Sequence, residues 1–158
     1  MYKTLLHQYQ LVLSSREALF NYCETIKIGH LLTPLPSFNN ESIISQMMHV
    51  ANCYLFWLAK SVMKQHRPYF KHEDHRDLAT VRKAYKQVDL IMNDFLQSFK
   101  ESLEQQMFIT RPDGSTLTRS PFEIFTHAIT HEFHHKGQVV NMSRQLGYTP
   151  VDTDVIRE

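Results

Sequence analysis

The stretch SPFEIFTHAITHEFHHKGQVVNMSRQLG, residues 120–147, is the best-delimited helix in the sequence and the starting point for the fold. Ser120 suits the N-cap, Pro121 suits the first helical position, and Glu123 lies where a capping box places its acidic residue. Gly147 suits the left-handed residue that commonly follows a helix. We therefore predict one long helix that fills this stretch.

Three earlier segments show the same helical pattern, because their apolar residues recur at spacings of three and four. We assign these segments to helices from Tyr2 to Ile28, from Asn39 or Asn40 to Lys64, and from Leu78 to Glu104. Gly29 suits the residue that ends the first helix, and either asparagine suits the cap of the second. The prolines cluster between the helical segments, as is typical of an all-α protein.

A short segment before the last helix has a different pattern. Residues 107–110 and 115–118 carry β-forming side chains, and they flank the sequence Pro112-Asp-Gly114. The Asp-Gly step is a strong turn signal. We therefore predict a short hairpin between the third and fourth helices.

Four helices with connectors of moderate length predict an all-α four-helix bundle, formed as a single domain by residues 1–158. The composition agrees with a globular protein, since 42% of the residues are hydrophobic and 21% are charged. The formal net charge is +1. Because this charge provides no strongly basic surface, we do not expect a nucleic-acid partner.

The sequence also indicates where in the cell the protein is expected. The N-terminus lacks a charged region followed by an apolar core, so no signal peptide is evident. The longest apolar run, from Cys53 to Ala59, is too short to cross a bilayer. We therefore expect a cytoplasmic protein without a membrane partner. Cys23 and Cys53 are expected to be buried reduced thiols, and a disulfide between them stays open as the alternative.

The last helix is unusually rich in histidine, at positions 127, 131, 134 and 135. His127, His131 and His135 are spaced by four residues, so neighbours in this series lie about 6 Å apart on one helix face. Two imidazoles at that distance can bind one metal ion. Spacing alone does not decide between the pair His127 and His131 and the pair His131 and His135.

A third ligand is expected from another helix, because a catalytic zinc-type site usually has three protein ligands and an open position. His49 is the best candidate, since it lies among apolar residues of the second helix. The alternative is a core histidine that hydrogen-bonds to a neighbour. The string His131-Glu-Phe-His-His135 also fits the metalloprotease pattern His-Glu-x-x-His, but no suitable third ligand follows it. On the helical wheel Glu132 points away from the histidines, so we expect it to be exposed.

Two motifs resemble those of the DinB/YfiT-like metalloenzyme family. The string His131-Glu-Phe-His-His-Lys-Gly-Gln138 matches a signature like His-x-x-x-His-[Arg/Lys]-Gly-Gln, and Ser42-Ile-Ile-Ser-Gln-Met-Met-His49 matches a second-helix segment like Ser-Ile-x-x-x-x-x-His. The resemblance extends over nearly the whole chain in helix order. It implies an up-down-down-up four-helix bundle and a divalent metal ion, zinc or nickel, held by His49, His131 and His135. Many relatives form dimers, so it also implies a homodimer.

The resemblance leaves two classes of function open. We expect a metal-dependent enzyme, a thiol S-transferase or a hydrolase, that acts on a small-molecule substrate with a low-molecular-weight thiol. His127, His134 and Gln138 are candidates for catalytic groups that move protons or orient other groups at the rim of the site. Lys136 stands where arginine is commoner in the family. The alternative is a non-catalytic metal-binding stress-response protein, in which the ion joins two helices.

Overall fold

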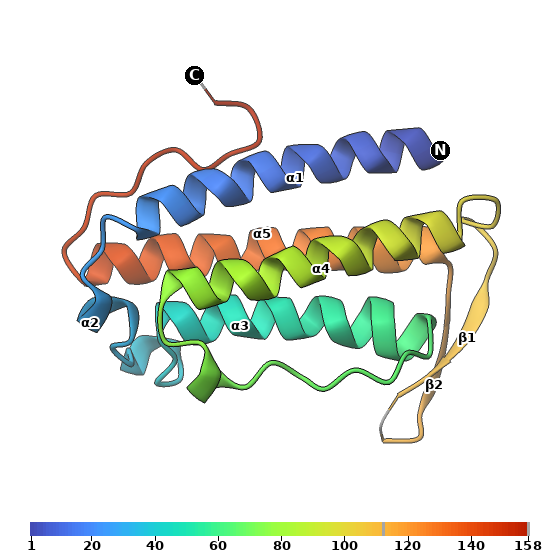
Figure 1. Cartoon of the computed structure of the whole chain (residues 1–158), viewed down its shortest axis with the longest axis horizontal. Coiled ribbons are helices and arrows are strands. Elements are labelled where there is room, and N and C mark those ends of the chain that lie inside the picture. Colours follow the sequence, from blue (N-terminus) through green and yellow to red (C-terminus); the bar gives the residue numbers. More distant parts are fainter. Residues whose placement is uncertain (112, 158) are drawn as a thin grey trace.

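The structure, a computed structural model, describes residues 1–111 and 113–157 and is mostly helical (Figure 1). Its long elements are α1 (Tyr2–Cys23), α3 (Ile43–Tyr54), η2 (Leu55–Val62), α4 (Leu78–Ser98) and α5 (Pro121–Gln145). Its short elements are α2 (Ile28–Leu31), η1 (Pro36–Phe38), η3 (His72–Asp74), β1 (Met107–Thr110) and β2 (Thr116–Arg119). η2 is a π-helix that follows α3 directly. The prediction of a mostly helical protein is therefore confirmed.

The long helices lie side by side along the long axis of the molecule (Figure 1). The connector at residues 63–77 runs back along the molecule, so that α3 and α4 begin at the same end. α1 and α5 run in the opposite direction. α3 and α5 are therefore antiparallel neighbours in contact, and this arrangement decides which of their side chains face each other.

The first helix ends earlier than predicted. α1 stops at Cys23, and the predicted end at Ile28 is wrong because Lys27 adopts an extended conformation (φ −58°, ψ 134°). The short helix α2 then begins, and Gly29 lies inside it instead of ending α1. The break allows Leu31 to enter the core, where it is almost fully buried.

The second and third helices also differ at their ends. Asn39 and Asn40 both have positive φ and form a turn, so Ser42 is the cap of α3, where its side chain accepts a hydrogen bond from the Ser45 amide. The helical run ends at Val62, close to the predicted end at Lys64. α4 ends at Ser98, not at the predicted Glu104, because Phe99 has left the helical conformation (φ −111°, ψ 12°).

The last helix and the hairpin agree with the sequence. Ser120 and Glu123 form the predicted capping box, with the Glu123 amide donating to Ser120 Oγ at 3.2 Å and the Ser120 amide donating to Glu123 Oε2 at 2.7 Å. Gly147 follows α5 with a φ of 88°, a conformation that favours glycine. β1 and β2 pair antiparallel, which confirms the predicted hairpin. Pro112 of the predicted turn lies outside the described residues.

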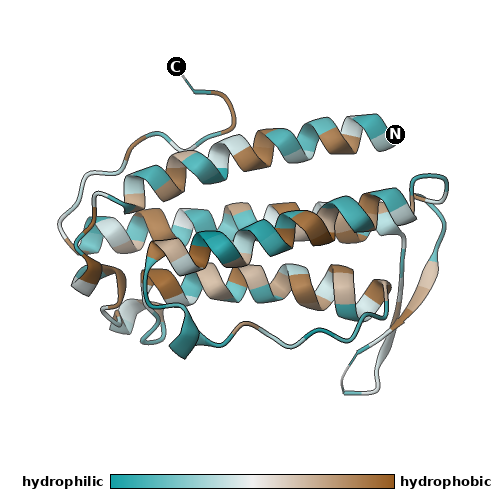
Figure 2. Cartoon of the chain, viewed as in Figure 1, coloured by the Kyte–Doolittle hydropathy of each residue, from teal (hydrophilic) through white to brown (hydrophobic). Residues whose placement is uncertain are grey.

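Hydrophobic and hydrophilic residues alternate along each long helix, as expected for helices with one buried face (Figure 2). The largest fully buried side chains are Tyr9, Tyr54, Phe95 and Phe125. Cys23 is fully buried, Cys53 is half-buried, and both are free thiols. Within residues 1–111 and 113–157, none of the helices combines the length and the apolar character that a transmembrane span requires.

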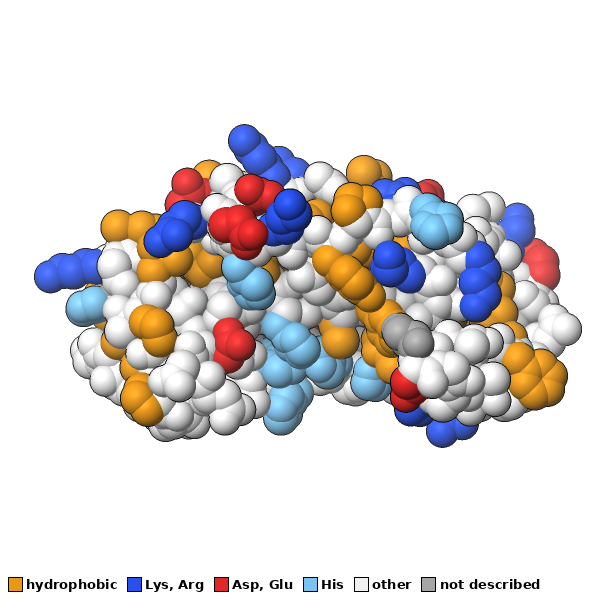
Figure 3. Space-filling model, turned by 90° about the horizontal axis from the view of Figure 1, so that it is seen from below, with side chains coloured by type: hydrophobic (Ala, Val, Ile, Leu, Met, Phe, Trp, Pro, Cys, Tyr) orange, Lys and Arg blue, Asp and Glu red, His pale blue; other side chains and the backbone are white. Residues whose placement is uncertain are grey.

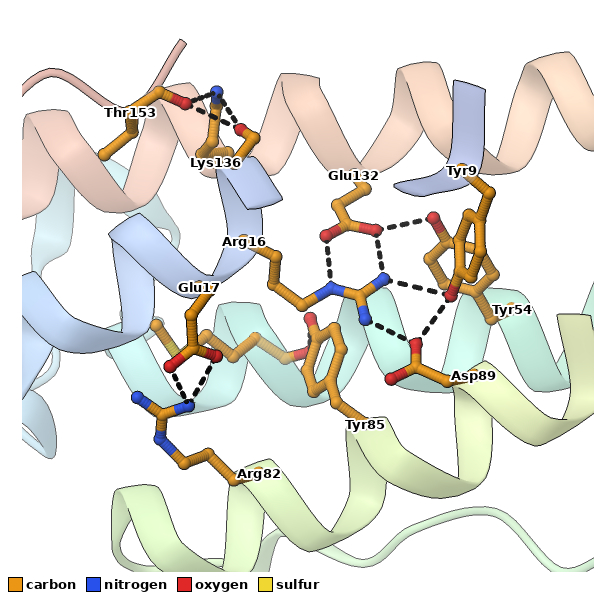
Figure 4. Close-up of polar contacts among 12 residues, drawn as sticks. Tyr9, Arg16, Glu17, Tyr54, Arg82, Tyr85, Asp89, Glu132, Lys136 and Thr153 are labelled. Atoms are coloured by element: carbon orange, nitrogen blue, oxygen red, sulfur yellow. Dashed lines mark hydrogen bonds and ion pairs between the residues drawn. The ribbon is translucent and has the colours of Figure 1, made fainter. Parts of the chain in front are cut away.

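A buried ionic network crosses the interior between α1, α3, α4 and α5 (Figure 4). Arg16 on α1 is 5% exposed and donates two hydrogen bonds to Glu132, from Nε at 2.6 Å and from Nη2 at 2.9 Å. It also donates to Asp89 at 2.6 Å, while Tyr9 donates to Asp89 and Tyr54 donates to Glu132. The prediction that Glu132 is exposed is therefore wrong, because α5 has neighbours on the face opposite its histidines as well.

Candidate metal centre

Antiparallel packing brings residues of α3 and η2 into register with residues of α5. The continuous helix formed by α3 and η2 places a side chain on the shared face every four residues, and so does α5. This spacing is close to the repeat of a helical turn. The facing pairs are His49 with His135, Cys53 with His131, and Trp57 with His127. We call this series of pairs the α3–α5 ladder.

The three histidines that the family resemblance singles out converge in the ladder. The Nε2 atoms of His131 and His135 are 3.1 Å apart. The ring of His49 lies 4.6 Å from the ring of His135 and 5.3 Å from that of His131, measured between centroids. Cys53 joins them, because one donor atom each from His49, Cys53 and His131 lies within 4.8 Å of the others. This group of histidine and cysteine side chains has the spacing of residues that could hold a metal ion.

Two glutamines orient the ring of His135. The oxygens Gln46 Oε1 and Gln138 Oε1 each lie 2.7 Å from His135 Nδ1. Since both partners are acceptors, Nδ1 carries the ring proton and Nε2 presents its lone pair toward His131. In a metal-binding imidazole, the ring nitrogen that does not bind the metal usually donates its proton to an oxygen such as a carbonyl.

The donor set fits a divalent ion. Two nitrogens about 2.1 Å from one ion, at a tetrahedral angle, would lie about 3.4 Å apart. The observed separation of 3.1 Å between His131 Nε2 and His135 Nε2 is close to that value. A shared proton could also lie between the two nitrogens, whereas a cation could in addition be held by the donor atoms of His49 and Cys53. Imidazole and thiolate ligands together suit zinc and related transition metals.

The surroundings of His131 and His135 favour the neutral form of both rings. Burial lowers the pKa of His131 to about 4, and the neighbouring His135 and His49 rings add to this effect. Burial and the nearby His49 ring also lower the pKa of His135. Neutral imidazole is the form that donates to a metal, so these two side chains are ready to bind at neutral pH without first losing a proton.

His49 differs from its expected setting. The sequence suggested a histidine embedded in an apolar helix face, but His49 is exposed, while its neighbours Met47 and Met48 are buried. The ladder therefore lies at the surface of the helices and not in the interior. Figure 3 shows histidine side chains gathered near the middle of one face, beside a hollow on the side toward the end that carries the hairpin.

Cys53 and Gln46 lie near the histidines, and sequence reasoning missed both. The thiol Sγ of Cys53 lies 3.7 Å from His131 Nε2, and burial raises the pKa of this thiol. Cys53 follows His49 by four residues, the same spacing that drew attention to His131 and His135. Gln46 precedes His49 by three residues, which is a weaker signal because it depends on knowing the partner helix.

The remaining candidates take different positions. His134 is exposed, and its Nε2 lies 3.1 Å from Nε2 of Gln138, so it touches the glutamine that holds His135. His127 is exposed and packs edge-to-face against Trp57. Lys136 turns away from the histidines, is 8% exposed, and donates to Ser15 Oγ at 2.9 Å and to the Thr153 carbonyl. Its ammonium group therefore fastens the C-terminal segment to α1 and α5.

The chain is similar to known proteins of one family. The model of the DinB family matches residues 1–158. Protein DinB of Bacillus subtilis (strain 168) is 33% identical over 60 residues, which is 38% of this chain and 34% of that protein. The uncharacterized protein YizA of the same organism is 23% identical over 142 residues, which is 89% of this chain and 87% of that protein. The chain thus spans about a third of protein DinB and most of YizA, and the family match over its whole length means that it belongs to the DinB family.

Proposed function

We propose that the chain binds one divalent metal ion through His49, His131 and His135 and works as a metal-dependent enzyme, of the thiol S-transferase or hydrolase type. The observation that carries this proposal is the pair of Nε2 atoms 3.1 Å apart, with His135 oriented by two glutamine oxygens. We infer zinc or nickel as the ion, since imidazole ligands suit both.

The exposure of the site supports catalysis. An ion with an open position lowers the pKa of a bound water or thiol and polarises a substrate bond. Gln46 and Gln138 keep the proton of His135 on Nδ1 and so direct Nε2 toward the site. His134, which is exposed and contacts Gln138, is placed to take up or release a proton at the rim. His127 lies at the end of the α3–α5 ladder that is farther from His135, where it pairs with Trp57.

The wider expectations form part of the same proposal. The substrate is a small molecule and the co-substrate a low-molecular-weight thiol, as the family resemblance implies. The chain directions of the long helices support an up-down-down-up bundle of a single domain. A homodimer remains an expectation from the family resemblance.

Metal analysis of the purified protein tests the ligand assignment. We expect about one divalent ion per chain in the parent protein, and near-complete loss in His49→Ala, His131→Ala and His135→Ala, because each removes one of three ligands. His127→Ala is the matched control, since it shares the four-residue spacing from His131 but is not assigned as a ligand. Loss of metal in His127→Ala with retention in His135→Ala would show that the other pair binds. Retention in all three ligand variants would refute the site.

A non-catalytic metal-binding protein is the second candidate, and Cys53 is the observation that favours it. The Cys53 thiol lies 3.7 Å from His131 Nε2, close enough for its thiolate form to become a fourth protein ligand, which would close the site to substrate.

The cobalt-substituted protein distinguishes an open site from a closed one. For the open catalytic site we expect no sulfur-to-cobalt charge-transfer absorption until an external thiol is added. Cys53→Ser should then bind metal as the parent does. An intense band in the parent without added thiol, absent in Cys53→Ser, would instead favour the closed site. Cys23→Ser is the control, because Cys23 is buried on α1.

A further inference from the structure

The α3–α5 ladder continues past the metal ligands into an aromatic pair. Trp57 and His127 form the next step after Cys53 and His131, with ring centroids 5.1 Å apart and planes at 73°. The ring of His127 lies 5.7 Å from the ring of His131. The aromatic pair therefore begins directly beside the proposed ligands, about one helical turn or ~5.4 Å further along α3 and η2.

This aromatic pair is accessible. His127 is exposed and Trp57 is half-buried, so part of the indole surface faces solvent. Phe56 packs edge-to-face on Trp57 with centroids 4.9 Å apart, and this contact supports the indole from one side. Trp57 lies in the π-helix η2, and π-helical turns often occur at functional sites.

The aromatic pair lies toward the end of the molecule that carries the hairpin. β1 contacts η2, so the hairpin stands at the end of the ladder that carries Trp57. In Figure 3 the hollow lies between the histidines and that end of the molecule. A small molecule bound to the ion by one donor group would extend either along the ladder toward Trp57 or out into solvent.

We propose that Trp57 and His127 bind a planar aromatic group of the substrate, while the donor atoms of that substrate bind the metal ion. Aromatic rings prefer edge-to-face or offset contact at centroid distances of 4.5–7 Å, and the exposed parts of the indole and imidazole are available for such contact with a third ring. This inference rests on the proposed function, since the metal ion anchors the other end of the ligand. The proposed site should therefore prefer substrates in which a metal-binding group is joined directly to an aromatic ring.

Two hydroxamates of equal chelating chemistry test the inference on the zinc-loaded protein. Benzohydroxamate and acetohydroxamate differ only in carrying a phenyl ring or a methyl group. We expect benzohydroxamate to bind on the order of ten-fold more tightly, as measured by calorimetry. Trp57 is the one tryptophan in the sequence, so selectively excited tryptophan emission reports on this position alone and should change on binding of the aromatic probe.

Variants of the pair decide the outcome. Trp57→Ala and His127→Ala should bind both hydroxamates with nearly equal affinity, whereas Trp57→Phe should keep the preference, with zinc retained in all three. The His127→Ala protein keeps its indole, so the result does not depend on Trp57→Ala folding well. Equal affinity in the parent, or a preference that persists in both alanine variants, would overturn the inference while leaving the metal site standing. A parent protein that binds no zinc would overturn the inference and the proposed function together.

Discussion

Replacing Arg16 with methionine should lower the free energy of unfolding by about 3–5 kcal/mol, the cost of removing one partner from a buried ion pair. Arg16 is 5% exposed and holds both Glu132 and Asp89. Without it, the Glu132 carboxylate would stay buried with only the Tyr54 hydroxyl as a donor. Urea denaturation of the two proteins, followed by circular dichroism, measures the difference.

Arg82 provides a matched control for this prediction. It also joins α4 to α1, by ion pairs with Glu17 at 2.8 Å and Glu24 at 2.9 Å, but both carboxylates are more than half exposed. Such surface pairs contribute at most about 1 kcal/mol, so Arg82→Met should have a small effect. If the two variants lose equal stability, burial is not what gives Arg16 its importance.

The ionic network also affects the candidate metal centre. Glu132 directly follows His131 on α5, and it anchors the inner face of that helix to Arg16 and Tyr54. This anchoring sets the rotation of α5 that turns His131 toward Cys53. A helix free to rotate would move His131 away from Cys53, whose Sγ lies 3.7 Å from His131 Nε2.

Saturating zinc should stabilise the folded protein, because its proposed ligands come from α3 and α5 and the unfolded chain does not bring them together. At a zinc concentration about a thousand times Kd, the expected gain in the free energy of unfolding is about 4 kcal/mol. Urea denaturation with zinc and with a chelator measures this gain. The effect should disappear in His135→Ala, whose Nε2 lies 3.1 Å from that of His131.

His134→Ala is the control for zinc stabilisation, since His134 is adjacent in sequence but exposed and in contact with Gln138. It should keep most of the gain. Equal stabilisation of the parent and His135→Ala would mean that zinc binds elsewhere, and stabilisation lost in both variants would point to a general effect of removing histidine from α5.

Sequence patterns were most accurate where the interactions are local. The capping box of Ser120 and Glu123 and the glycine that follows α5 depend on residues within one turn, and both occur as expected. The predicted ends of α1 and α4 were less accurate, because the true ends depend on the packing of Leu31 and Phe99 against the rest of the core. A helical pattern in the sequence does not reveal where such a contact interrupts the helix.

The sequence by itself determined the helical class, the hairpin and the histidine spacing on α5, since each arises from short-range periodicity and turn chemistry. It also carried the family motifs that singled out His49, His131 and His135. Only the tertiary structure decided that Cys53, Gln46 and Trp57 belong beside these histidines and that Glu132 is buried with Arg16. The physical reason is that facing residues on antiparallel helices are set by the register and rotation of two distant segments, which neither segment encodes alone.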